Sequence, residues 1–295
     1  MSSTRIISVD FECRRPATLA EALENLLKEG AQVLAGGTDL INSMKTNAAK
    51  PRCLVWVLGV KELNYIKFDQ GLTIGAGTRL SEIELNERVA GRYPALVEAI
   101  NAIGGTQIRN MATLAGNLCN ASPGADTPPI LLALGAEVEI CCSNGPGLQR
   151  TALPLKDFFT GPKMTVLKPG QMLTSVFVPQ PPVHSGAAFR RLARVSLDIA
   201  KINCAVYLER EGDSIRQARV ALGSVAPTPV RAPKVEETLK GQKKSESLFH
   251  EAAVMVENDI APITDVRSSA DYRRQAAGLL LREALMEAWK RSGGK

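Results

Sequence analysis

Histidine, aromatic residues and long apolar runs are scarce in this sequence, and its cysteines are scattered. Two of the 295 residues are His and 4% are aromatic, which leaves little for histidine-based metal or acid–base chemistry. The six cysteines form no C-x-x-C pair, which argues against a disulfide scaffold, a zinc finger or a locally bound iron–sulfur cluster. No apolar run approaches the roughly 20 residues that cross a bilayer, so we expect no membrane insertion.

The N-terminal segment lacks the unbroken apolar core of a signal peptide, and we expect a cytoplasmic protein. The net charge of +6 is not accompanied by basic residues interleaved with stacking aromatics, so no nucleic-acid partner is expected. A basic surface is equally suited to an acidic protein partner. The cations of a long C-terminal helix are expected on its solvent face: Arg273, Arg274, Arg282, Lys290 and Arg291.

The length predicts about two domains, and the pattern of elements places a boundary near the Pro-rich segment 179–186. Before it, Thr18 is expected to cap a helix over 19–27, and helices are also expected to start near Ser81 and at Pro94. After it, strands followed by helices indicate an α+β order. Strands are predicted at 32–35, 53–57, 65–68, 72–75, 136–141, 172–178, 187–192, 202–209 and 215–224.

Two segments rich in Gly, Thr, Asn and Ser lie between apolar runs. The first is LAGGTDL, residues 34–40, where a strand enters two glycines whose backbone N–H groups have no Cβ obstruction. Such a loop suits a phosphate or pyrophosphate. The second is TLAGNLCNASPGAD, residues 113–126, which supplies polar side chains and ends on Asp126, a carboxylate able to accept hydrogen bonds from ribose hydroxyls.

Taken singly, each segment also has an ordinary interpretation. The first is compatible with a simple turn and an Asx-type cap, and the second with a polar loop. Neither matches the G-x-G-x-x-G dinucleotide fingerprint or the Walker pattern. A third glycine cluster, from Gly75 to Thr78, is interpreted as structural, as the end of a strand that leads into the helix near Ser81.

Read together, LAGGTDL, LTIGAGTRLSEIE and GGTQIRNMATLAGNLCNASPGADTPPILLALGAEVEI resemble the FAD-binding medium subunit of the molybdenum hydroxylases, which include xanthine and carbon monoxide dehydrogenases. The resemblance covers nearly the whole chain. It implies an α+β fold: a vanillyl-alcohol-oxidase-type FAD-binding region of two α/β subdomains, then a C-terminal domain of antiparallel sheet and helices. The implied domains are residues 1–57, 58–178 and 187–291.

The resemblance also implies where FAD binds. The first loop would hold the pyrophosphate, and the second loop matches a T-I-G-G-N pattern from which Leu114 and Ala115 depart. The extra methyl of Ala115 is tolerable if its φ is negative, although it narrows the cradle. Arg190 matches a basic position near the flavin. No catalytic or metal-binding residue is expected. The implied FAD contacts are Leu34, Ala35, Gly36, Gly37, Thr38, Asp39, Leu40, Ile103, Thr113, Ala115, Gly116, Asn117, Ser122, Asp126, Leu167 and Arg190.

The implied function is electron transfer. In this family a large subunit carries molybdopterin, a small subunit carries two [2Fe–2S] clusters, and FAD in the medium subunit passes their electrons to an external acceptor. The resemblance thus implies that this chain has both subunits as partners, in a dimer of heterotrimers. Two alternatives stay open: a scaffold subunit that keeps the fold without flavin, and a self-sufficient flavin oxidase. The sequence does not identify the substrate or the acceptor.

Overall fold

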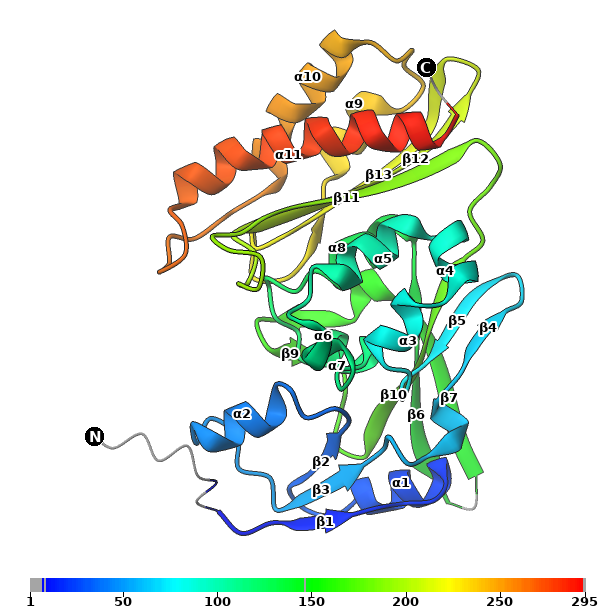
Figure 1. The fold of residues 1–295 in the computed structure, drawn as a ribbon, viewed down its shortest axis with the longest axis vertical. Helices are drawn as coiled ribbons and strands as arrows, with labels where there is room; N and C mark the ends of the chain where they lie inside the picture. The colour runs from blue at the N-terminus through cyan, green and yellow to red at the C-terminus, as the bar shows by residue number, and fades with distance from the viewer. Residues whose placement is uncertain (1–6, 8, 146, 294–295) are drawn as a thin grey trace.

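The computed structural model describes residue 7 and residues 9–145 and 147–293, whose three main sheets are stacked along the long axis of the molecule (Figure 1). The first sheet is parallel and has the order β1-β3-β2, with α1 and α2 beside it. Its elements are β1 (Glu12–Arg14), α1 (Leu19–Leu26), β2 (Ala31–Leu34), α2 (Leu40–Lys45) and β3 (Cys53–Trp56).

Helix α1 forms as its sequence predicts. The Thr18 side-chain oxygen accepts a hydrogen bond from the Glu21 N–H at 3.2 Å, which satisfies one of the free donors at the helix start. The face formed by Leu19, Leu23 and the other apolar residues of α1 is buried against the rest of the core. This first unit therefore presents the end of β2, where LAGGTDL begins, to the middle of the molecule.

The second sheet is antiparallel, in the order β4-β5-β10-β6-β7. Strand β7 was not expected from the sequence, because this edge strand exposes nearly all of its side chains and shows no apolar alternation. Its partner β6 continues to Asn144 instead of ending at 141. The strands are β4 (Ile66–Phe68), β5 (Gly71–Gly75), β6 (Glu137–Asn144), β7 (Gly147–Pro154) and β10 (Gln171–Pro179), with a separate hairpin of β8 (Phe159–Gly161) and β9 (Met164–Thr165).

Short helices cover the second sheet, and the third glycine cluster leads into them. A Cβ at Gly75 would lie 2.3 Å from the Leu63 carbonyl oxygen, so glycine is needed there for packing, as interpreted from the sequence. The helices are α3 (Leu80–Glu84), α4 (Glu87–Arg92), α5 (Pro94–Asn101), α6 (Thr106–Arg109), α7 (Leu114–Cys119) and α8 (Thr127–Leu134), with the 3₁₀ turns η1 (Lys61–Leu63) and η2 (Leu155–Asp157).

The third sheet is antiparallel, in the order β11-β12-β13-β14, and the last helices cover its outer face (Figure 1). We call this sheet and those helices the C-terminal unit. Loop 180–184 joins it to β10. Its elements are β11 (Ser185–Leu192), β12 (Ile202–Glu211), β13 (Ser214–Gly223), β14 (Val230–Arg231), α9 (Pro233–Leu239), α10 (Glu246–Met255), η3 (Val256–Asp259) and α11 (Ala270–Arg291).

Alternate residues of the third sheet belong to two different cores. Ala188 and Val206 pack with the helices of the C-terminal unit, whereas Phe189 and Tyr207 pack with the middle of the molecule. Helix α8 lies against this inner face and contacts β12 and β13. All eight of its residues are buried, because it is enclosed on every side.

In helix α11, not all of the cations lie on the solvent face as the sequence predicts. Its apolar stripe from Ala277 to Ala288 is buried as predicted, and Arg282 and Lys290 are exposed. The Arg273 side chain, however, is only 4% exposed and donates to the Ser224 carbonyl at 2.6 Å and to Asp265 at 2.7 Å. Arg291 is also partly buried, paired with Glu98. Within the described residues, no helix is both long and apolar enough to cross a membrane.

Candidate functional site

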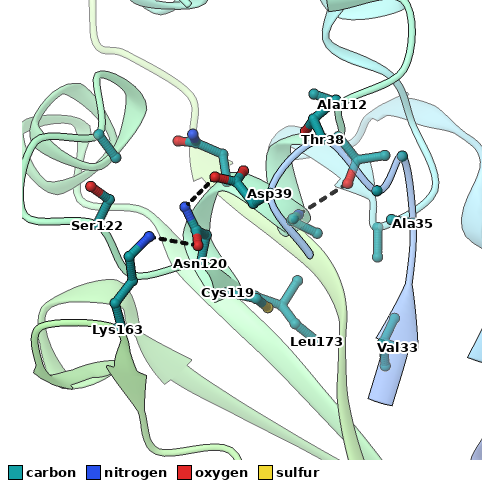
Figure 2. Close-up of a pocket in the computed structure, with 18 of the residues that line it drawn as sticks. Val33, Ala35, Thr38, Asp39, Ala112, Cys119, Asn120, Ser122, Lys163 and Leu173 are labelled. Atoms are coloured by element: carbon teal, nitrogen blue, oxygen red, sulfur yellow. Dashed lines mark hydrogen bonds between the residues drawn. The ribbon is translucent and has the colours of Figure 1, made fainter. Parts of the chain in front are cut away.

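A cavity of about 940 Å³, the central cavity, lies where the first sheet, the second sheet and the β11–β12 loop meet. Residues at the end of β2, at the start of α7 and in the segment before β10 line this cavity. Side chains from three distant stretches of sequence therefore face one space (Figure 2). The predicted residues that line it are Ala35, Gly36, Gly37, Thr38, Asp39, Ile103, Thr113, Ala115, Gly116, Asn117, Ser122, Asp126 and Leu167.

The first glycine loop, residues 35–39, connects β2 to α2 and packs directly on the backbone that precedes the second loop. A Cβ at Gly36 would lie 1.9 Å from the Met111 carbonyl oxygen, closer than any real contact, so a larger residue would push the two segments apart. Gly37 has φ of +71°, a conformation that favours glycine. The two motifs that the sequence singled out thus meet at one wall of the cavity.

The second loop is the N-terminus of α7. The Thr113 side-chain oxygen accepts from the Gly116 N–H at 3.0 Å, leaving the N–H groups of Leu114 and Ala115 without intrahelical acceptors. Ala115 lies inside α7 with an ordinary helical backbone, so its departure from glycine causes no strain. Its side chain is buried and also lines the cavity. The wall formed by the two loops is therefore rich in backbone donors.

Asp126 places a carboxylate in the cavity lining beside the second loop, because the next residue, Thr127, donates from its hydroxyl to Asn117 Oδ1 at 2.6 Å. Its Oδ1 accepts from Asn203 Nδ2 at 2.8 Å and from Arg191 Nε at 3.1 Å, and among the described residues none donates to Oδ2. Burial raises the pKa of Asp126 to about 6, against the lowering effects of Arg191 and Asn203. One oxygen of this buried carboxylate is consequently available to a ligand donor.

Three predicted contacts do not line the cavity: Leu34, Leu40 and Arg190. Leu34 ends β2 and Leu40 begins α2, on either side of the loop itself. Arg190 turns toward the C-terminal helices and lies 3.8 Å from Glu287. The reason is strand alternation, because Phe189 and Arg191 face the middle of the molecule while Arg190 faces away. The basic residue that reaches the cavity carboxylate is Arg191.

The structure also adds residues that sequence analysis missed. Lys163 and Asn120 line the cavity, as does the exposed loop residue Leu197. Cys119 lines it as well, and burial raises the pKa of its thiol to about 12. Only the Gly161-Pro162 dipeptide, a turn signal, marked the position before Lys163. Among the described residues, no group of three or more His, Cys, Asp or Glu could hold a metal.

A cavity lined by two glycine loops and a buried carboxylate has the features of a site for a nucleotide-type cofactor. The comparisons with known proteins identify the family. Residues 9–181 match the family described as FAD binding domain in molybdopterin dehydrogenase, and residues 187–288 match CO dehydrogenase flavoprotein C-terminal domain. The chain belongs to this family of FAD-binding medium subunits, which confirms the resemblance and the predicted fold class.

Three of the similar proteins match along nearly their whole length. The carbon monoxide dehydrogenase medium chain of Afipia carboxidovorans is 33% identical, over 97% of this chain and 99% of its own. The xanthine dehydrogenase FAD-binding subunit of Escherichia coli O157:H7 is 32% identical, over 95% and 97%. Carbon monoxide dehydrogenase from Hydrogenophaga pseudoflava superimposes with a TM-score of 0.92 at 32% identity, covering 97% of this chain and 99% of that one.

The residues around the central cavity fit FAD. The cavity volume is near the upper end of the range for small-molecule sites, about 300–1,000 Å³. The close approach at Gly36 leaves room for no side chain, and the free N–H groups of α7 suit phosphate oxygens. No described residue of the lining is aromatic, so contact with a flavin ring would be aliphatic, from Ile103 and Leu167.

Proposed function

We propose that this chain holds FAD in the central cavity and transfers electrons between [2Fe–2S] clusters of a small partner subunit and an external acceptor. The observation that carries the proposal is the contact between the two glycine loops at Gly36, which builds one continuous wall of backbone donors. The family assignment supports the same function. When bound, FAD supplies the electron-transfer chemistry itself.

The chain's own residues bind and orient the cofactor. We assign the pyrophosphate to the N–H groups of loop 35–39 and of Leu114 and Ala115, where Gly37 and the α7 N-terminus leave backbone donors open. Ser122 and the free Oδ2 of Asp126 are assigned to hydroxyl groups of the cofactor. Ile103 and Leu167 exclude water beside the flavin ring. None of these roles requires an acid–base catalyst.

The experiment that tests this proposal compares two alanine variants. Purified wild-type chain, reconstituted with FAD, is expected to show flavin absorbance near about 450 nm. Gly36→Ala should reduce FAD affinity on the order of 100-fold, because the new methyl separates the two loops. Gly91→Ala is the matched control, since a Cβ there meets nothing within 4 Å. Wild-type chain without flavin bands would contradict the proposal and favour the scaffold alternative.

We further propose that the chain assembles with a large molybdopterin-binding subunit and a small [2Fe–2S] subunit, as a dimer of heterotrimers in the cytoplasm. The medium-chain names of its relatives support this, and the net charge of +6 is compatible with docking. Copurification followed by native mass measurement tests the stoichiometry. A stable, isolated monomer in cells would contradict it, and turnover of an electron donor by this chain alone would favour the oxidase alternative.

The proposed domains are residues 1–57, 58–178 and 187–291. Their support is that each contains one of the three main sheets. Limited proteolysis of the apo chain, with cleavage expected near 57–58 and within 179–186, tests these boundaries.

A further inference from the structure

Lys163 belongs to a row of polar side chains that crosses the central cavity (Figure 2). Its Nζ donates to Asn120 Oδ1 at 2.8 Å, and Asn120 Nδ2 donates to Asp39 Oδ1 at 2.9 Å. The row joins the β8–β9 turn, the end of α7 and the first glycine loop. Lys163 is thereby connected to the loop that we assign to the cofactor phosphates.

The backbone fixes Lys163 at this position. Its N–H donates to the Ala121 carbonyl oxygen at 2.8 Å, which ties the β8–β9 turn to the residue that follows α7. Both residues have positive φ, +62° at Lys163 and +44° at Ala121, a region that non-glycine residues adopt rarely. The strained pair persists because the surrounding structure holds it.

The charges that line the cavity leave Lys163 as the cation of the first loop. The lining residues with charged side chains are Asp39, Asp126, Asp198, Lys163 and Lys168. Asp126 is paired with Arg191, and Asp198 with Arg194. Asp39, at the first loop, receives a hydrogen bond from Asn120 and would repel an anionic ligand unless a cation lies near. A pyrophosphate would add further negative charge at the same loop.

We propose that Lys163 is a phosphate-binding residue of the FAD site, a role that rests on the proposed function of the central cavity. An ammonium group has three donors, and Asn120 uses one of them. The remaining donors are available to phosphate oxygens, and Asn120, which bonds both Lys163 and Asp39, ties the ammonium to the first loop. The Lys163 ammonium thus places a positive charge at the phosphate site before the cofactor binds. This charge favours binding of a phosphorylated flavin over riboflavin.

The test measures binding of FAD and riboflavin to the apo chain by quenching of flavin fluorescence, at several salt concentrations. Lys163→Met should weaken FAD binding about tenfold, leave riboflavin binding within twofold, and flatten the dependence of FAD affinity on salt, because one screened charge contact is lost. Lys163→Arg should restore most of the affinity. Lys240→Met, at an exposed lysine outside the cavity lining, is the control and should stay within twofold of wild type.

Equal losses for FAD and riboflavin, or a loss with unchanged salt dependence, would assign Lys163 a structural role and overturn the proposal. An unchanged FAD affinity would overturn it too. Thermal unfolding of each apo variant shows whether the fold is kept, and if Lys163→Met is unstable, Lys163→Gln replaces it. A wild-type chain that binds no FAD would instead contradict the proposed function, so the two failures are distinguishable.

Discussion

Two arginine–aspartate pairs, one at the central cavity and one in the C-terminal unit, are built differently. Asp265 accepts hydrogen bonds from the Arg267 and Ser268 N–H groups and from Arg273, and its second oxygen lies 3.4 Å from Arg267. Burial opposes its ionisation, but these donors outweigh burial and lower the pKa of Asp265. Both of its oxygens have partners, which is what a structural ion pair needs.

At Asp126 in the central cavity, the effect of burial on the pKa exceeds the effect of the donors. Asp126 uses one oxygen for Arg191 and Asn203, and burial, the largest effect, raises its pKa to about 6. The comparison teaches that a buried carboxylate with an unused oxygen and a raised pKa indicates a place kept for a ligand. A carboxylate whose two oxygens both have partners, such as the partly exposed Asp265, indicates a structural role.

The largest expected effect comes from breaking the structural pair. Arg273→Met should lower the free energy of unfolding by about 3 kcal/mol, because the buried Ser224 carbonyl and Asp265 each lose a hydrogen bond from a charged donor. Denaturant unfolding measures the change. Arg274→Met is the control, since its partner Asp271 is exposed and the loss should stay within about 1 kcal/mol. Equal losses in the two variants would contradict the structural role of the Arg273 pair.

The two carboxylates should also differ in the sign of their pH dependence. Because the folded-state pKa of Asp126 is raised, its contribution to stability is present below the unfolded value near 4 and is lost as pH rises through about 6. In the apo chain, the stability of wild type relative to Asp126→Asn should therefore fall between pH 4 and 7, by up to about 3 kcal/mol.

Asp265 should show the reverse, since its folded-state pKa is lowered. Its contribution is present above the unfolded value and is lost as pH falls further, so wild type should lose stability relative to Asp265→Asn on acidification. Unfolding curves for the three proteins at a series of pH values test both signs. If the stability of wild type relative to each variant changes with pH in the same direction for both substitutions, the two pairs do not differ as we expect.

The smallest expected effect separates two neighbouring arginines. Arg191→Met should weaken FAD binding about tenfold, or about 1.4 kcal/mol, because Asp126 and the carbonyls of Ser196 and Asp198 lose their donor at the cavity. Arg190→Met should leave FAD binding within twofold, since its side chain faces Glu287. Equilibrium titration of each apo variant with FAD decides between them, and a larger effect at Arg190 would support the sequence-based assignment instead.

Much of the site could be predicted from the sequence, because certain residue types indicate the local backbone conformation. Glycines at 36 and 37 and the Thr113 cap mark the two loops locally, and their family pattern joins them. The choice between Arg190 and Arg191 could not be predicted, because it depends on which face of β11 meets the cavity. The sequence of a strand shows that successive side chains point to opposite faces of the sheet. It does not show which part of the molecule packs against each face.

Other differences between the sequence-based expectations and the structure have equally physical reasons. The helical stripe of α11 predicted its apolar face correctly but could not show that a loop with Asp265 would cover Arg273. Strand β7 gave no apolar alternation because both of its faces are exposed. Lys163 lies far in sequence from both glycine loops, and its relation to Asp39 exists only through Asn120. Long-range contacts of this kind carry no local signal.

Helix α8 gives the molecule a mechanical property. It is buried along its whole length, contacts the second and third sheets, and begins directly after the cavity carboxylate Asp126. Any swing of the C-terminal unit about loop 180–184 would expose this apolar helix to water. Loop 180–184 is therefore a connection and not a hinge, because the packing of α8 fixes the C-terminal unit, with the β11–β12 loop that lines the cavity, against the second sheet.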